Sequence, residues 1–206
     1  MVEIILIRHG VTLWNRSARI QGISDVELSE EGLRQAELLA KNFPFDKVDA
    51  VYSSDLSRAK TTAKFVADKF NLPVQTTSEL REVDFGSWEG KYFSDLEKSE
   101  PDNLKIFYTA PDELRLARAE TFQQAQSRAM SAIKKIIAYH ELDGDSRIVA
   151  VAHGSINRTI LCAVLGIPLK NLWRISQFNT AINIFRVDDG NFTVQLINST
   201  AHLTEN

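Results

Sequence analysis

Close to its start the chain reads Ile4-Ile5-Leu6-Ile7-Arg8-His9-Gly10-Val11-Thr12. The first four residues of this stretch are apolar and mostly β-branched, a composition typical of a strand that is buried on both faces. The run then ends in a cation, an imidazole and a glycine. Because open α/β sheets bind ligands beyond the carboxyl ends of their strands, Arg8 and His9 are predicted to lie at a binding edge. Gly10 allows the backbone to turn there or to be approached closely.

A second stretch, Arg147-Ile148-Val149-Ala150-Val151-Ala152-His153-Gly154-Ser155, repeats this design. Two buried strands that both end in His-Gly at the same sheet edge would bring His9 and His153 to one site. The strand and helix signals alternate along the rest of the chain. Strands are predicted at 4–7, 48–53, 73–76, 147–152, 181–187 and 192–197, and helices at 29–43, 54–70, 121–144 and 155–165. This order predicts an α/β fold, a three-layer α/β/α sandwich whose mixed, mostly parallel sheet is covered on both faces.

Size and composition limit the possible classes of protein. With 206 residues, 44% of them hydrophobic, the chain is long enough for one well-buried domain. We expect a single domain over residues 1–206. The segment from about 91 to 118 mixes charges of both signs with aromatic residues and two prolines. It is therefore expected to form a small inserted lid.

Charge and cysteine content limit the expected partners and give the cytoplasm as the expected location. The formal charge of −3 argues against a nucleic-acid partner, which usually meets a basic face. Cys162 is the only cysteine, so no disulfide forms within the chain and a reducing compartment fits. Few apolar residues precede Arg8, too few for a signal peptide, and no run is long enough to span a bilayer. No membrane partner is expected, and oligomeric state is not predicted.

The charged residues at the strand ends suit phosphoryl transfer, which needs positioning and positive charge around the phosphate oxygens. Arg8 can bind phosphate through paired N–H donors. Arg58 falls in the first turn of a predicted helix, where backbone N–H groups already favour an anion. His9 can attack phosphorus if its reacting nitrogen is unprotonated, and His153 can donate to the oxygens as charge builds up.

A leaving alkoxide also needs a proton, which Glu82 could supply. Its apolar neighbours Val83, Phe85 and Trp88 favour the protonated carboxyl. Asp84 and Glu89, in the same loop, are the alternatives.

Five blocks of sequence occur together in one order and cover most of the chain outside residues 91–118. They are Arg8-His9-Gly10-x-Thr12-x-x-Asn15, Asp25–Ala36, Ser53–Thr61, Leu80–Gly90 and Val151-x-His153-Gly154. In these blocks the chain resembles the histidine phosphatase superfamily, the phosphoglycerate-mutase-like proteins. The resemblance implies His9 as phosphorylated nucleophile and Glu82 as proton donor. It implies a phosphate pocket of Arg8, Arg58 and His153, with Asn15, Gln21 and Gly22 lining the site; we add Gly154 and Ser155 as substrate-binding residues. No metal and no cofactor are implied.

The branch of the family follows from departures from the mutase pattern. Mutases of this family carry a tyrosine three residues after the acid and an adjacent Arg-Arg pair in the lid. Here Phe85 stands at the first position, and Arg115 and Arg118 are separated by two residues. The expected function is metal-independent hydrolysis of small phosphorylated metabolites through a phosphohistidine. The alternative is a 2,3-bisphosphoglycerate-dependent phosphoglycerate mutase. A remote alternative is a non-catalytic phospho-ligand binding module, which would be expected to lack the nucleophile or the acid.

Several residues keep two interpretations. Arg19 either reaches the phosphate or is solvated. Arg115 and Arg118 are interpreted as solvated, although they could bind a substrate carboxylate. The hydroxyl of Ser155 could simply cap the helix that follows. The remaining histidines, His140 and His202, are expected at the surface, and His9 with His153 could form a metal pair only with a third ligand, for which no zinc-like spacing exists.

Overall fold

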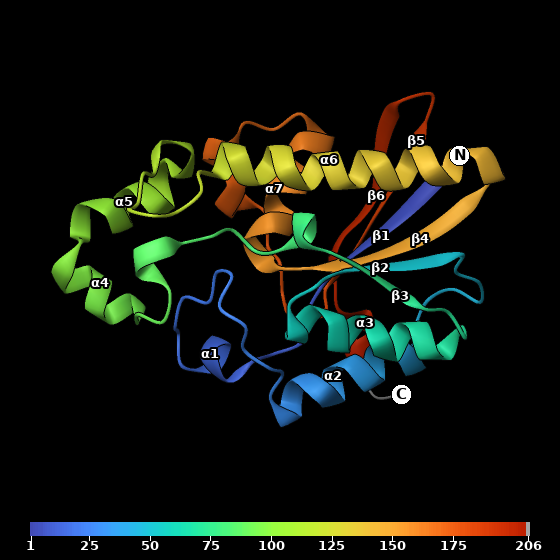
Figure 1. Cartoon of the computed structure of the whole chain (residues 1–206), viewed down its shortest axis with the longest axis horizontal. Helices are drawn as coiled ribbons and strands as arrows, with labels where there is room; N and C mark the ends of the chain where they lie inside the picture. The colour runs from blue at the N-terminus through green and yellow to red at the C-terminus, as the bar shows by residue number, and fades with distance from the viewer. Residues whose placement is uncertain (205–206) are drawn as a thin grey trace.

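The structure is a computed structural model that describes residues 1–204. Six strands form one sheet in the order β3-β2-β4-β1-β5-β6 (Figure 1). The strands are β1 (Val2–Arg8), β2 (Ala50–Ser54), β3 (Val74–Thr77), β4 (Ser146–Ala152), β5 (Ile182–Asp188) and β6 (Asn191–Ser199). β3, β2, β4 and β1 run parallel, and β5 and β6 pair antiparallel. The predicted mixed, mostly parallel sheet is confirmed, including the C-terminal hairpin.

Two pairs of helices cover the two faces of the sheet (Figure 1). On one face lie α6 (Phe122–His140) and α7 (Gly154–Leu165), and on the other lie α2 (Glu30–Lys41) and α3 (Ser57–Lys69). Successive residues of a strand point to opposite faces. Accordingly, Ile4 and Leu6 pack in the core under α6 and α7, whereas Ile5 and Ile7 pack in the core under α2 and α3. Because both faces of β1 are buried, its sequence is a continuous apolar run rather than an alternating one.

The helix ends follow the capping signals in part. Thr121 and Gln124 form a capping box where the helix was predicted to begin, at the start of α6, and the Ser29 hydroxyl accepts a hydrogen bond from the backbone N–H of Gly32 in α2. The start predicted for the second helix is wrong by three residues, because Ser54 belongs to β2. A short helix, α1 (Leu13–Arg16), lies between the first predicted strand and the first predicted helix, where the sequence predicted neither. One helical turn is too short to show apolar periodicity.

The segment predicted as an insertion begins after a loop with two 3₁₀ turns, η1 (Ser78–Leu80) and η2 (Gly86–Trp88). It contains α4 (Phe93–Ser99), α5 (Pro101–Thr109) and the 3₁₀ turn η3 (Pro111–Glu113). Figure 1 shows α4 and α5 at one end of the molecule, beyond the carboxyl ends of the parallel strands. Leu96 and Phe107 anchor them in the core shared with α6 and α7. The remaining 3₁₀ turns are η4 (Glu141–Asp143), η5 (Leu169–Arg174) and η6 (Ala201–Leu203).

The expectation that His140 and His202 lie at the surface is wrong, since they are only 6% and 5% exposed. His140 ends α6, and its Nε2 lies 3.1 Å from the hydroxyl of Tyr52 on β2. His202 lies in η6, and its Nε2 is 3.0 Å from the hydroxyl of Thr180. His140 continues the buried stripe of α6, four residues after Ile136 and three after Ile137, so helical spacing could have identified its burial. His202 lies in a turn too short to show such a pattern. Separately, none of the helices in residues 1–204 has the length and apolarity needed to cross a bilayer.

Candidate active site

The pairing of β1 with β4 brings the two His-Gly stretches together. The strands are in parallel register with Arg8 beside Ala152, and the backbone N–H of His9 donates to the carbonyl of Ala152 at 3.1 Å. The rings of His9 and His153 are therefore 5.1 Å apart between centroids. Gly10 is needed for close approach, since a Cβ there would lie 2.6 Å from the carbonyl oxygen of Gly32.

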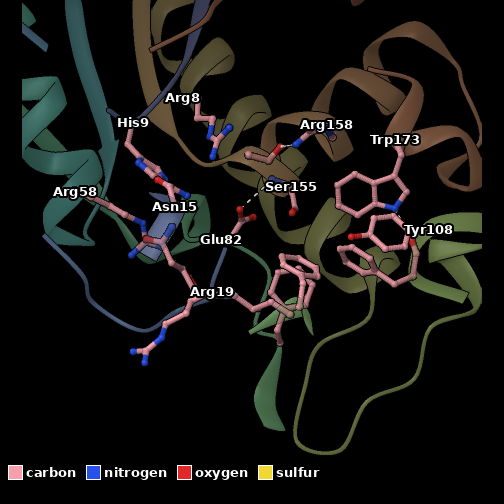
Figure 2. Close-up of a pocket in the computed structure, with 17 residues that line it drawn as sticks. Arg8, His9, Asn15, Arg19, Arg58, Glu82, Tyr108, Ser155, Arg158 and Trp173 are labelled. Atoms are coloured by element: carbon pink, nitrogen blue, oxygen red, sulfur yellow. Dashed lines mark hydrogen bonds between the residues drawn. The ribbon is translucent and has the colours of Figure 1, made fainter. Parts of the chain in front are cut away.

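A cavity of about 220 Å³ opens beside His9 (Figure 2). The sequence-predicted residues that line it are Arg8, His9, Asn15, Gln21, Gly22, Arg58, Glu82, Gly154 and Ser155. His153 is not part of the lining; it is fully buried against His9. Both nitrogens of the His153 ring lack a hydrogen-bond partner among the described residues.

Two arginines supply fixed positive charge. Arg58 is 1% exposed, and its guanidinium donates to the carbonyls of Ser24 and Gly22 at 2.8 and 2.7 Å. Arg8 donates from Nη1 to the carbonyl of Gln177 at 2.5 Å. Burial, together with the nearby Arg158 guanidinium, lowers the pKa of Arg8 to about 10, so it remains charged at neutral pH. A buried and a half-buried guanidinium, both held in place before any ligand arrives, favour an anion in this cavity.

The state of the His9 ring follows from its single hydrogen bond. Nδ1 lies 2.7 Å from the carbonyl oxygen of Gly10. A carbonyl only accepts, so Nδ1 carries the proton and Nε2 keeps a free electron pair. Burial and the charges of Arg58 and Arg8 hold the pKa of His9 well below its usual value of 6.5. Nε2 is therefore unprotonated at neutral pH, as a nucleophile must be.

The environment of Glu82 differs from the apolar one predicted. Its carboxylate accepts three backbone hydrogen bonds, from Val83 at 2.9 Å, Ile156 at 2.8 Å and Ser155 at 2.9 Å. The N–H groups of Ile156 and Ser155 belong to the first turn of α7 and have no partner within the helix, so Glu82 satisfies them. The sequence neighbours of Glu82 could not reveal this contact.

The alternatives to Glu82 are used elsewhere. Asp84 accepts from the backbone of Gly86, and Glu89 accepts from the backbone of Ile23 and Ser24 and from the Ser24 hydroxyl. Neither lines the cavity, so Glu82 is the one carboxylate among its lining residues.

The open interpretations of four other residues are also decided by their contacts. The N-cap of α7 is His153, so the capping role suggested for the Ser155 hydroxyl is wrong. Arg19 lines the cavity wall, but its Nη2 donates to the Tyr92 hydroxyl at 2.7 Å, and in Figure 2 its guanidinium points away from the cavity. Arg115 and Arg118 are exposed and outside the lining.

Sequence reasoning missed Arg158 and the aromatic part of the wall. Arg158 lies four residues after Gly154 on α7 and donates to its carbonyl at 3.0 Å. Helical spacing of i, i+4 from the His-Gly motif could have identified it. The aromatic residues come from three separate segments, and no local pattern joins them. They are Phe85, Phe93, Phe107, Tyr108 and Trp173. Within residues 1–204, no three His, Cys, Asp or Glu side chains gather as metal ligands would.

Arg128 on α6 holds the segment that contains Glu82 through hydrogen bonds to its backbone. It pairs with Glu120 at 2.6 Å and donates to the carbonyls of Glu79, Arg81 and Glu82 at 2.7, 3.1 and 3.3 Å. Replacing Arg128 by alanine would leave these acceptors unpaired, so we expect the free energy of unfolding to fall by about 3 kcal/mol. Urea unfolding measures this.

The matched control is Lys134→Ala, an exposed cation on the same helix, for which we expect a change within about 0.5 kcal/mol. Equal unfolding free energies for the two variants would contradict this role of Arg128.

Buried histidines make stability depend on pH. Burial holds the pKa of His9 and His153 well below 6.5 and lowers the pKa of His202 to about 4. As the pH falls below 6.5, the unfolded chain binds protons at these rings and the folded protein does not. We therefore expect stability to fall on acidification by up to about 1.4 kcal/mol per pH unit for each histidine, and to lose this dependence above about pH 7.

Urea unfolding between pH 7.5 and 5, in a phosphate-free buffer, measures this slope. His202→Gln should reduce this slope, because it removes one of the rings that take up a proton on unfolding. His202 lies outside the cavity, so the variant leaves the site intact. A stability that is independent of pH across this window would show that the rings titrate normally in the folded protein.

The chain matches known proteins over nearly its whole length. The family described as the histidine phosphatase superfamily (branch 1) matches residues 4–200. The chain is 31% identical over 207 residues to the metal-independent phosphoserine phosphatase of Arabidopsis thaliana, covering 99% of this chain and 84% of the relative. It is 34% identical over 207 residues to phosphoglycerate mutase-like protein 4 of the same plant, covering 98% and 87%. The solved structure of Bacillus stearothermophilus YhfR gives a TM-score of 0.93 at 32% identity, over 99% of this chain and 100% of that one.

Proposed function

The chain belongs to branch 1 of the histidine phosphatase superfamily and is a phosphatase, and we propose that it hydrolyses small phosphomonoesters without a metal, through a phosphohistidine at His9. The observation that carries this proposal is the state of the His9 ring. Its Nδ1–H is held by the carbonyl of Gly10, which leaves Nε2 unprotonated beside a cavity that Arg8 and Arg58 also line.

The first step transfers the phosphoryl group to the protein. Arg8 and Arg58, which line the cavity, bind the phosphate oxygens. His153 packs edge-to-face against His9 behind the lining, and we assign its unpaired ring nitrogens the role of donor to one of these oxygens. His9 Nε2 attacks phosphorus in line with the ester oxygen, and the P–O bond to the alcohol breaks. Glu82, in its carboxylic acid form, gives its proton to the departing alkoxide.

The second step returns the group to water. The Glu82 carboxylate, which the N–H groups of Ser155 and Ile156 hold in place, takes a proton from water as its oxygen attacks phosphorus. The P–N bond to His9 breaks, inorganic phosphate leaves, and Glu82 is again a carboxylic acid. Asn15, Gln21, Gly22, Gly154 and Ser155 complete the wall around the phosphate.

We propose that residues 91–118 act as a lid inserted in a single domain. The segment contributes Phe93, Phe107 and Tyr108 to the cavity, on the side where the alcohol must lie. The single cysteine, Cys162, is buried and unpaired, which fits a reducing compartment such as the cytoplasm.

Phosphoglycerate mutase activity is the competing proposal, because it differs only in the molecule that accepts the phosphoryl group. A mutase must retain a bisphosphate, which needs a second cluster of cations. Phe85 lines the cavity where a mutase of this family has tyrosine, and Arg115 and Arg118 lie exposed outside it. Water is therefore the expected acceptor.

Phosphorus NMR of 3-phosphoglycerate, with a chelator and a trace of 2,3-bisphosphoglycerate, distinguishes the two activities. We expect inorganic phosphate as the product. Formation of 2-phosphoglycerate would show that the cavity retains the bisphosphate and would overturn the assignment as a hydrolase. If 3-phosphoglycerate does not react, the same measurement is made on the esters described below.

A further inference from the structure

The half of the cavity away from His9 is walled by aromatic rings. Phe85, Phe93, Phe107, Tyr108 and Trp173 all line it. Figure 2 shows Tyr108 and Trp173 across the cavity from His9 and Arg58. The phosphate half and the alcohol half of the site therefore differ in chemistry, one cationic and the other aromatic.

This aromatic wall is packed rigidly from behind. The Phe107 ring is 4.6 Å from Trp173 and 5.8 Å from Trp88 between centroids, and the Trp173 indole N–H donates to the carbonyl of Phe107. Trp88 is fully buried, whereas Phe93 is half-buried and Tyr108 is 53% exposed. Phe107 and Trp173, which are held by these contacts, present apolar faces with little conformational entropy to lose on binding.

Few charged side chains in the cavity lining are free to bind charged groups on the alcohol part of a substrate. Glu82 is the one carboxylate among the lining residues, and it already accepts three backbone hydrogen bonds. An ammonium group on the alcohol would find no other anion in the lining. The guanidinium of Arg158 lies 5.2 Å from the Trp173 ring centre, with Nε and Nη1 donating to the carbonyls of Ile175 and Gly154.

We propose that the preferred substrates are phosphomonoesters whose alcohol carries an aromatic ring close to the ester oxygen. This inference rests on the proposed function. The ring stacks among Phe107, Tyr108 and Trp173, while the phosphate lies between Arg8 and Arg58. Small amino-acid esters such as phosphoserine, the substrate in the name of one relative, are poorer substrates because no carboxylate besides Glu82 lines the cavity to pair with their ammonium group.

The test compares kcat/KM for 2-phenylethyl phosphate, propyl phosphate and O-phosphoserine. The first two alkoxides differ little in basicity, so a difference in rate reports binding of the ring rather than intrinsic reactivity. We expect 2-phenylethyl phosphate to exceed the other two by at least about tenfold. Equal values for the phenylethyl and propyl esters would overturn the substrate class. Failure of all esters, including p-nitrophenyl phosphate, to release phosphate would instead overturn the proposed function.

Variants of the aromatic wall test whether these rings cause the preference for the phenylethyl ester. Tyr108→Leu and Trp173→Leu should each lower the phenylethyl-to-propyl ratio about three- to tenfold. Trp173→Phe keeps a ring but loses the hydrogen bond to Phe107, so it should preserve the ratio if stacking is responsible. Tyr139→Leu, at a ring 68% exposed on α6 and outside the lining, is the matched control. A ratio unchanged in both leucine variants would contradict the proposal.

Discussion

Replacing His9 by alanine is expected to lower kcat by roughly 10⁴-fold or more, the scale seen when a covalent nucleophile is removed from an enzyme. The ring is 2% exposed, its Nδ1 is held by the Gly10 carbonyl, and Nε2 is left free. The neighbouring lining residues have other roles, because Arg8 and Arg58 are cations that cannot attack phosphorus and Glu82 transfers the proton. The release of phosphate from 2-phenylethyl phosphate measures the loss.

Two controls separate lost chemistry from lost structure. His9→Ala should still bind inorganic phosphate, since the guanidinium groups of Arg8 and Arg58 are held by backbone carbonyls and not by His9. His202→Gln removes an imidazole that is about as buried but outside the cavity, and should keep full turnover. Turnover of His9→Ala within about tenfold of the parent would exclude His9 as the nucleophile.

The second large effect is expected from Glu82→Gln. An amide cannot give a proton to the alkoxide, so transfer from alkyl phosphates should slow by about 10²- to 10⁴-fold. p-Nitrophenolate needs no proton to leave, and its release in the first turnover should change little. Later turnovers of p-nitrophenyl phosphate should still be slow, because the attack of water also uses Glu82. A rapid burst followed by a slow steady rate is therefore the expected signature.

Rapid-mixing measurements on the two esters give the comparison. The matched control is Glu89→Gln, a carboxylate of the same loop that also accepts several hydrogen bonds but does not line the cavity. That variant should be less stable and should keep the parent's dependence on the leaving group. An equal loss of first-turnover rate for both esters in Glu82→Gln would remove Glu82 from the role of proton donor.

Much of the framework was predictable because its signals are local. Strand β1 and strand β4 are continuous apolar runs, and the Thr121–Gln124 capping box marks the start of α6. Two His-Gly ends on parallel strands must meet if the strands are neighbours, and β1 and β4 are neighbours. The approach of the His9 and His153 rings thus follows from chain pattern and sheet geometry together.

Features that depend on distant contacts were not predictable. The carboxylate of Glu82 meets the first turn of α7, more than seventy residues away along the chain. The aromatic wall joins Phe85, Tyr108 and Trp173 from separate segments. His202 lies in η6, a turn too short to show periodicity, where its Nε2 meets the hydroxyl of Thr180.

Trapping the phosphohistidine would show the covalent intermediate itself. In Glu82→Gln the first step with p-nitrophenyl phosphate is retained and the second is slowed, so the phosphorylated protein should accumulate. Alkaline quenching preserves phosphohistidine, and mass spectrometry of the digested protein locates it. We predict one added phosphoryl group, on the peptide that contains His9, and none when His9 is also replaced by alanine. A burst of p-nitrophenol with no phosphorylated peptide, or with the group on another residue, would contradict the mechanism.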